Sequence, residues 1–252
     1  MKNDSTGKVL FVAVTLCVVC SVLVSAAAVG LRGRQEKNAR QFKQYNVLIA
    51  AGLAEPGQKV DIDKLFEQIQ VELVDLATGK VVATGAEAAA YDAVAEAKKP
   101  ASCVTIPPKL DSAGIKHRAK RAVVYKHVVD GKLVSYVLPI YGKGLWSTMY
   151  GFLAVAADRT TIKGIVYYEQ GETPGLGGEV ENPRWRAQFP GKKLFDASGN
   201  YDFRVLKGVG HAKTEHEADG LSGATMTTRG VDGMIRYWLG PHGLGPYFGH
   251  GT

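Results

Sequence analysis

An uncharged apolar run close to the N-terminus limits what this chain can form more than any other feature. Val9 to Gly30 is 22 residues long and contains no Asp, Glu, Lys or Arg. At ~1.5 Å per residue, a helix of this length crosses the roughly 30 Å hydrocarbon layer of a bilayer. The sequence therefore predicts that residues 1–33 form an N-terminal segment with a single transmembrane anchor.

A secretory signal peptide is the competing interpretation of this run. Lys2 and Lys8 precede it, and Ala26-Ala27-Ala28 offers small residues for cleavage. The run is longer than the roughly 7–15 apolar residues of a signal peptide, which favours a retained anchor. The orientation of the anchor is a separate question. Counting positive charges on the two sides of the run places the large domain in the cytoplasm. The basic residues after the run are Arg32, Arg34, Lys37, Arg40 and Lys43.

The remaining sequence is typical of a globular protein. Of the 252 residues, 46% are hydrophobic and 22% charged, which is enough for a packed core in one or two domains. The net charge of +7 is scattered, and no nucleic-acid partner is predicted from it. Its one dense run, residues 116–121, is predicted to be a solvated strand edge, with a docking patch as the alternative. Cys103 is alone outside the apolar run, so neither a disulfide nor a thiolate metal site is expected.

Local patterns predict an α+β fold, in which the transmembrane helix is followed by a mixed, largely antiparallel sheet domain with flanking helices. The Asp130-Gly131 pair suits a tight hairpin turn between two apolar strands. We expect one compact domain over residues 34–252. The predicted helices are 34–51, 61–69, 86–99 and one around 231–239. The predicted strands are 71–76, 81–84, 122–129, 133–140, 152–156 and 162–168. Residues 104–113 are a predicted connector.

The segment with the clearest chemistry is Asp219 to Thr228. Apolar residues at helical spacing follow it, so Thr225 is predicted near a helix N-terminus. Unpaired N–H groups and the helix dipole stabilise a phosphate there, and Gly220 and Gly223 allow a close backbone approach. The simpler alternative is that Ser222 or Thr225 only caps the helix. A threonine hydroxyl is a poor nucleophile, so a covalent bond at Thr225 would need a separate enzyme.

Three segments carry a family resemblance. Residues 219–225 (Asp-Gly-Leu-Ser-Gly-Ala-Thr) resemble the flavinylation motif of extracytoplasmic FMN proteins, whose last threonine is esterified to the FMN phosphate. Residues 172–177 (Glu-Thr-Pro-Gly-Leu-Gly) and 141–147 (Tyr-Gly-Lys-Gly-Leu-Trp-Ser) resemble two further elements of the same domain. With the single span and the closing helix, the chain is similar over nearly its whole length to the NqrC subunits of the sodium-translocating NADH:quinone oxidoreductases.

This resemblance implies a set of site residues in which Thr225 is the covalent attachment point of FMN. Asp219 is expected to assist a modifying flavin transferase through a magnesium ion. Trp146 and Lys207 are expected at the flavin ring and at its polar edge, with a core position and a solvated strand end as their respective alternatives. No catalytic residue and no resident metal site is predicted. The other expected contacts are Ser222, Gly223 and Ala224 at the phosphate, and Glu172, Thr173, Leu176 and Gly177 along the ring.

The resemblance also implies a function and a location. The chain would pass electrons from an iron–sulfur centre in neighbouring subunits toward a second covalently bound FMN and finally quinone, with NADH bound elsewhere. Its FMN-binding part would cover about residues 120–240. The domain would lie on the periplasmic side of a bacterial inner membrane, in conflict with the positive-inside count.

Three alternatives remain at the level of sequence. The homologous RnfG subunit of the Rnf-type electron-transport complex uses the same flavinylation motif. A free-standing extracytoplasmic FMN reductase should bring a second cofactor or substrate site of its own. A cofactor-free, membrane-anchored assembly protein would use residues 222–225 only to cap a helix.

Overall fold

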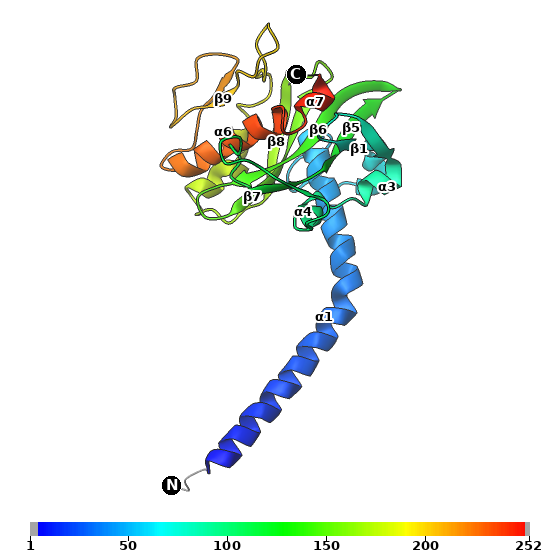
Figure 1. The fold of residues 1–252 in the computed structure, drawn as a ribbon, viewed down its shortest axis with the longest axis vertical. Coiled ribbons are helices and arrows are strands. Elements are labelled where there is room, and N and C mark those ends of the chain that lie inside the picture. The colour runs from blue at the N-terminus through cyan, green and yellow to red at the C-terminus, as the bar shows by residue number, and fades with distance from the viewer. Residues whose placement is uncertain (1–4, 250–252) are drawn as a thin grey trace. The chain divides into compact units, whose positions relative to one another are not determined.

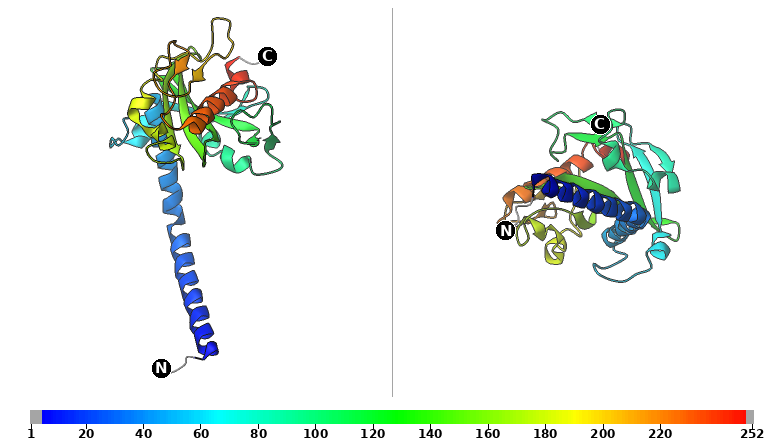
Figure 2. Two further views of the ribbon diagram at one scale, coloured as in Figure 1. Left: turned by 90° about the vertical axis from the view of Figure 1, so that its left-hand side faces the viewer. Right: turned by 90° about the horizontal axis from the view of Figure 1, so that it is seen from below.

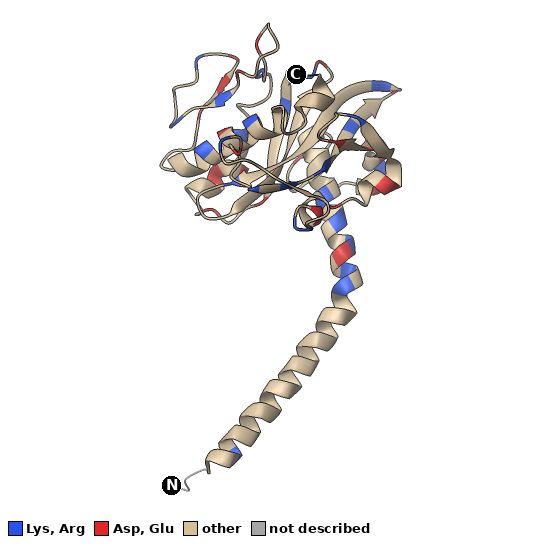
Figure 3. Ribbon diagram, in the orientation of Figure 1, with Lys and Arg blue, Asp and Glu red and all other residues tan. Residues whose placement is uncertain are grey.

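The computed structural model describes residues 5–249 and contains two compact units, the first ending at Lys43 and the second beginning at Gln44. Helix α1 (Thr6–Ala51) carries an apolar stretch of mean hydropathy 2.8 with no buried residue. Figure 3 shows this stretch and the charged turns that follow it along the helix. Its length and composition fit a single-pass membrane anchor. Gly52 follows the helix at φ +77°, the left-handed conformation in which glycine commonly ends a helix.

The second unit is built on one antiparallel sheet of six strands, as predicted for an α+β domain (Figure 1). The strand order is β2-β1-β5-β6-β7-β8, so consecutive strands are neighbours except where β1 pairs with β5. The bounds are β1 (Ile69–Asp75), β2 (Val81–Thr84), β5 (Arg121–Val129), β6 (Lys132–Lys143), β7 (Thr148–Ala156) and β8 (Ile162–Glu169).

Two hairpins set the register of the central strands. Asp130 and Gly131 have φ of 50° and 73°, the positive values that a tight two-residue hairpin requires, and they join β5 to β6 as predicted. The β6–β7 ladder runs from Ser135 opposite Ala156 to Lys143 opposite Thr148. This ladder ends at residues 144–147, which places that short loop at one end of the sheet.

Each face of the sheet is covered by a helix. Helix α6 (Thr225–Leu239) packs Met234 and Trp238 into the core of one face, and Trp238 Nε1 donates to the Tyr141 carbonyl at 2.8 Å. The last turns of α1 bury Val47 and Leu48 in a second core on the opposite face. Figures 1 and 2 show α6 lying along the sheet. The sheet thus forms the middle of a three-layer arrangement.

Short elements complete the described part of the chain. Strands β9 and β10 form a small parallel pair, and β3 and β4 form an antiparallel ribbon. The bounds are α2 (Ile62–Phe66), α3 (Gly85–Ala89), α4 (Ala93–Glu96), β3 (Cys103–Thr105), β4 (His117–Ala119), η1 (Gly177–Glu181), α5 (Pro183–Arg186), β9 (Arg204–Val205), β10 (Glu217–Ala218) and α7 (Gly245–Phe248).

Three local predictions in the first half were wrong. The helix expected over residues 61–69 ends at Phe66, because Ile69 begins the paired strand β1. The helix expected over 86–99 is two short helices, and Asp92 starts the second by accepting hydrogen bonds from the N–H groups of Val94 and Ala95. The connector expected over 104–113 begins inside strand β3.

The basic run at residues 116–121 is largely exposed, as predicted for a solvated strand edge: Lys116, His117, Lys120 and Arg121 are exposed, and Arg118 is the exception among its charged residues. Arg118 lies on β4 with only 7% of its surface exposed, and its Nη1 donates to the Ala119 carbonyl at 2.9 Å. Lys120 Nζ donates to the Ala101 carbonyl at 2.8 Å. The burial of Arg118 within an otherwise exposed run is not revealed by a pattern of charges alone.

Candidate functional site

The turn before α6 is held by close backbone contacts. The N–H of Leu221 donates to Thr228 Oγ1 at 3.0 Å, and Gly223 has φ +70°. A Cβ added to Gly220 would lie 2.2 Å from the Leu206 carbonyl oxygen, so only glycine fits there. The helix begins after Ala224, which makes no side-chain capping bond. The capping role considered for Ser222 or Thr225 is therefore wrong, and no side chain caps the N-terminus of α6.

The threonines of this turn differ in access. Thr227 and Thr228 are each 1% exposed, and both hydroxyls are used within the protein. Thr225, the first residue of α6, is half-buried, and Ser222 is exposed. Within residues 219–228, Thr225 is thus the one threonine that is not buried.

Glu172 connects the 172–177 and 144–147 segments with the first turn of α6, which begins at the last residue of the third resembling segment. Glu172 is 5% exposed. Oε1 accepts from the N–H groups of Trp146 and Ser147 at 2.9 and 3.1 Å. Oε2 accepts from the Leu145 N–H at 3.0 Å and from Thr227 Oγ1 at 2.6 Å. One side chain thereby fixes the 144–147 loop and the 172–177 loop against the first turn of α6.

The same contacts determine the charge of Glu172. Burial alone would raise the pKa of its carboxyl, but the hydrogen bonds from Thr227 and from the loop N–H groups outweigh burial and hold the pKa below its usual value. A Cβ on Gly144 or Gly177 would come within 2.6 or 2.8 Å of the Glu172 side chain, so both neighbours must be glycine. We conclude that the carboxylate positions the loops, because its oxygens are already used by protein donors.

Four exposed apolar side chains, which we call the apolar cluster, belong to the segments that Glu172 joins. Leu145, Trp146, Leu176 and Met226 are 47%, 67%, 44% and 52% exposed. Leu176 Cδ2 lies 3.0 Å from the position that a Cβ on Gly223 would take. The alternative of Trp146 as an ordinary core residue is wrong. Sequence reasoning missed Leu145 and Met226, although each lies directly beside a residue that was singled out.

The remaining predicted residues, Asp219, Lys207 and Thr173, differ in their contacts. The Asp219 carboxylate accepts three backbone N–H bonds at 2.8 Å from residues 210–212. Burial tends to raise its pKa, but these bonds lower it below the usual value. Lys207 is exposed and follows Leu206, whose carbonyl packs on Gly220. Thr173 is exposed, and its carbonyl accepts from the N–H groups of Leu176 and Gly178.

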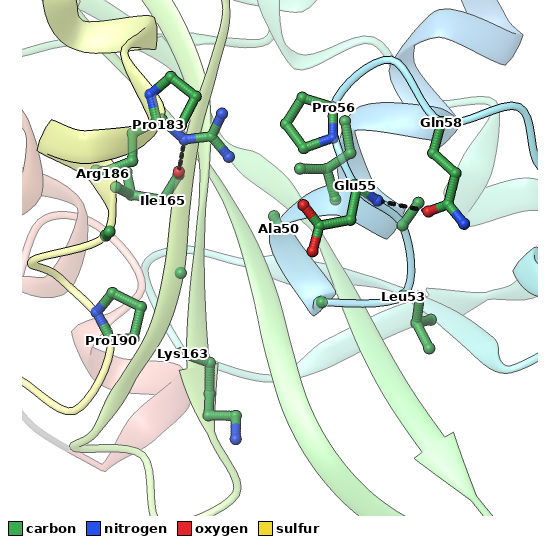
Figure 4. Close-up of a pocket in the computed structure, with 15 residues that line it drawn as sticks. Ala50, Leu53, Glu55, Pro56, Gln58, Lys163, Ile165, Pro183, Arg186 and Pro190 are labelled. Carbon is green, nitrogen blue, oxygen red and sulfur yellow. Dashed lines mark hydrogen bonds between the residues drawn. The ribbon is translucent and has the colours of Figure 1, made fainter.

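A separate cavity of about 340 Å³ lies between the end of α1, β8 and α5, and none of the predicted site residues lines it. Glu55 and Arg186 lie on its opposite walls (Figure 4). Arg186 Nε donates to the Ile165 carbonyl at 2.7 Å. Among residues 5–249, no group of three His, Cys, Asp or Glu side chains is arranged to hold a metal ion.

Comparison with known proteins identifies the family of this site. A family model described as an FMN-binding domain matches residues 144–240, which contain every predicted site residue. The NqrC subunit of the Na(+)-translocating NADH-quinone reductase of Vibrio vulnificus is 49% identical over 97% of this chain and 95% of the relative. The chain belongs to the NqrC family of the Na(+)-translocating NADH-quinone reductases. The corresponding protein of Neisseria meningitidis is 48% identical over 97% of this chain and 94% of its own length.

Solved structures of the NqrC family share the fold. The crystal structure of Shewanella oneidensis NqrC has a TM-score of 0.76 and 42% identity, and covers 83% of this chain and 96% of its own. The corresponding protein from Parabacteroides distasonis has a TM-score of 0.67 and 28% identity, and covers 88% of this chain and 98% of its own. The resemblance drawn from the sequence is confirmed, together with an FMN-binding domain in a subunit of an oxidoreductase complex.

Proposed function

We propose that this chain is an electron-transfer subunit that carries FMN joined through its phosphate to Thr225. The observation that carries the proposal is the uncapped N-terminus of α6, where Thr225 is half-buried while Thr227 and Thr228 are fully enclosed. A phosphate at this end is stabilised by the free N–H groups and the helix dipole. When bound, FMN supplies the redox chemistry, and the protein sets its position and its access to water.

The residues around this helix end fit the two parts of FMN. Ser222, Gly223 and Ala224 form a turn with little side-chain bulk in front of the helix, which suits the phosphate. The apolar cluster suits a flat ring, because exposed apolar side chains are stabilised when a ligand covers them. Glu172 holds Leu145 and Trp146 in place. We assign the exposed side chains of Thr173 and Lys207 to the polar edge of the ring, with Gly177 beside it.

The covalent bond requires a partner enzyme. On the transferase, Thr225 Oγ1 would form a new bond to the phosphorus of an activated flavin phosphate, a base of the transferase would take the hydroxyl proton, and the activating group would leave with the electrons of its broken bond to phosphorus. No described side chain makes a hydrogen bond to Thr225 Oγ1 that would mark a base, which agrees with a separate flavin transferase as the catalyst. We assign Asp219 a part in this maturation through a magnesium ion, in addition to its bonds to residues 210–212.

In the assembled complex, electrons would enter from an iron–sulfur centre of neighbouring subunits and leave toward a second FMN and finally quinone. The names of the relatives support this role, because each is one subunit of a NADH-quinone reductase. We place the extracytoplasmic part at residues 34–252, with its FMN-binding part at about 120–240, on the periplasmic side of a bacterial inner membrane.

The attachment site is tested by peptide mass analysis of the protein purified from its native membrane. The peptide containing Thr225 should carry FMN, and T225A should lose the flavin completely because no other threonine of the turn is accessible at the helix N-terminus. S222A is the matched control, since it removes the neighbouring exposed hydroxyl and should keep the adduct. An unmodified Thr225 in cells with an active flavin transferase would refute the proposal.

Orientation is tested by reporters fused after the C-terminus. A periplasmic enzyme reporter should be active and a cytoplasmic fluorescent reporter dark, despite the basic residues that follow the span. A bright cytoplasmic reporter with an inactive periplasmic one would place the domain inside the cell instead.

A further inference from the structure

The first residue of the 219–225 segment is held by side chains from a separate part of the chain. Gln188 Oε1 accepts from the Asp219 N–H at 2.7 Å, and Gln188 Nε2 donates to the Asp219 carbonyl at 2.9 Å. Trp185 Nε1 donates to the same carbonyl at 2.9 Å. Both backbone groups of Asp219 are therefore bonded by α5, which contains Trp185, and by the residues directly after it.

These bonds begin where the β9–β10 ladder ends. Ala218 is the last paired residue of β10, and its carbonyl accepts from the Leu206 N–H at 2.8 Å. Asp219 follows outside the ladder, where the amide of Gln188 supplies the paired donor and acceptor that a neighbouring strand would otherwise supply. The position of the Asp219 peptide thus depends on Gln188 and Trp185, because backbone polar groups inside a protein need such partners.

The fixed peptide determines where the Asp219 carboxylate lies. Burial tends to raise the pKa of this carboxyl, but three N–H bonds from residues 210–212, each 2.8 Å long, lower it below the usual value. The group is therefore ionised at neutral pH. A carboxylate has about four lone-pair sites, so these three bonds leave one site for a cation that another protein brings.

Trp185 is itself anchored in the core of the domain. Its ring packs edge-on against Phe189, with ring centres 4.8 Å apart and planes inclined by 68°. Phe189 is fully buried. The segment that holds Asp219 is thus tied to the rigid part of the fold, although it lies outside the three segments that carry the family resemblance.

We propose that Gln188 and Trp185 are positioning residues for the attachment of FMN, because they hold the Asp219 carboxylate in the geometry that the flavin transferase recognises. This rests on the proposed function, in which Thr225 receives FMN and Asp219 takes part through a magnesium ion. Losing the bonds to Asp219 lowers the fraction of chains that present this geometry. The KM of the transferase for this chain should then rise, while the rate at saturation is kept.

The test is the kinetics of flavin transfer to the full-length chain. The chain is produced in a host without the transferase, purified in detergent and supplied with the transferase, magnesium and FAD, in which AMP is the leaving group on the FMN phosphate. Mass analysis of the Thr225 peptide gives initial rates at increasing chain concentration. Q188M removes both Gln188 bonds at similar side-chain length and should raise KM about tenfold, with kcat changed less than about twofold.

Two further variants separate the individual bonds from general effects. W185F keeps an aromatic ring against Phe189 and removes only the indole donor. It should raise KM about threefold, because Gln188 Nε2 still donates to the Asp219 carbonyl. Q58M is the matched control, since Gln58 Oε1 accepts from the Glu55 N–H at 2.9 Å in the loop after α1. Loss of that bond should leave both KM and kcat unchanged.

A double-mutant cycle with D219N separates positioning from a general loss of structure. If Gln188 acts through the Asp219 carboxylate, Q188M should change KM less than about twofold once that carboxylate is gone. A general loss of structure would raise KM by the same factor with and without D219N. Thermal unfolding of each variant confirms that the compared chains are folded.

Equal KM for Q188M and the unmodified chain overturns the proposal, as does a tenfold rise that persists in D219N. If Q188M does not fold, W185F decides, and an unchanged KM in W185F has the same meaning. An unmodified chain that receives no FMN at Thr225 would instead refute the proposed function. Transfer to Thr225 that is independent of both Gln188 and Trp185 leaves that function standing and overturns only their positioning role.

Discussion

Among single residues, Glu172 shows how a site is fixed by one buried charge. Its carboxylate accepts four hydrogen bonds from donors that lie 25 to 55 residues away in sequence. Hydrogen bonds to a charged group are worth about 1.5–3 kcal/mol each, more than bonds between neutral groups. The loop that carries Trp146 therefore depends on Glu172, although Glu172 itself has no oxygen left over for a ligand.

Replacing Glu172 by Gln should destabilise the domain by about 2–3 kcal/mol. The amide N–H₂ group would replace one carboxylate oxygen and would then point a donor at other donors, either the Leu145 N–H or the N–H groups of Trp146 and Ser147. Thermal or denaturant unfolding measures this loss. T227V, which removes one donor, should cost about 1 kcal/mol, and T227S should cost less because it keeps the hydroxyl. Equal stability of E172Q and the unmodified chain would contradict the assigned role.

The same contacts predict a dependence on pH. The pKa of Glu172 is lower in the folded chain than its ordinary value of 4.5, so the folded state binds this proton less readily than the unfolded state. The stabilisation by Glu172 is therefore fully present above about pH 4.5 and is lost as the pH falls through the lower folded value. Unfolding curves should show a stability difference between the unmodified chain and E172Q that shrinks below pH 4.5. A difference that stays constant down to pH 3 would contradict this.

At the level of secondary-structure elements, α6 reaches the sheet through glycines. A Cβ on Gly230 would lie 2.3 Å from the Lys143 carbonyl oxygen, and one on Gly233 would lie 2.1 Å from that of Ser112. Ser112 Oγ also donates to the Gly233 carbonyl at 2.8 Å. Glycine disfavours helix formation, so two glycines within α6 would lower its stability without a compensating gain. The close contacts of Gly230 and Gly233 with neighbouring backbone supply that gain. The close approach brings the first turn of α6 onto the loop that follows β6.

G233A should destabilise the domain by about 1–3 kcal/mol, because the new Cβ would force the backbone of α6 away from the Ser112 carbonyl. This loss should outweigh the gain of about 1 kcal/mol that alanine gives an isolated helix. G33A is the control, since a Cβ there meets nothing within 4 Å. It should leave the unfolding temperature of the domain unchanged. A rise in stability for G233A would show that the approach of α6 is looser than described.

Across the whole molecule, the second compact unit includes the end of α1. Val47, Leu48 and Ala50 are at most 2% exposed and pack with Val71 and Phe152 on the face of the sheet opposite α6. Residues that continue from an apolar span are thus part of the core of the domain. The unit begins at Gln44, later than the sequence-based boundary at residue 34.

A chain that starts at Gln44 should fold as a soluble domain, whereas one that starts at Gly52 should be unstable. The shorter chain loses burial of Val47 and Leu48, each worth about 1.5–3 kcal/mol, and exposes an apolar face of the sheet. Solubility and thermal unfolding of the two truncated proteins measure the difference. Equal stability of both would mean that the end of α1 contributes nothing to the core.

Features with short-range signals were predictable from the sequence. The span of α1, the Asp130-Gly131 hairpin and the motif before α6 depend on residues that are neighbours along the chain, through apolar length, turn conformation and helical spacing. Predictions were wrong where pairing partners lie far away. Ile69 joins strand β1 and pairs with β5 instead of extending a helix. Arg118 is buried, although the charged residues around it are exposed as predicted.

Local periodicity and composition were enough to specify the membrane-spanning helix, the antiparallel sheet and the position of Thr225 at a helix start. Which groups meet at that helix depends instead on tertiary folding. The bond between Glu172 and Thr227 and the bond between Trp238 and Tyr141 each join segments that are distant along the chain. Contacts between distant segments leave no repeating pattern in the sequence. They can therefore be identified only from the folded protein.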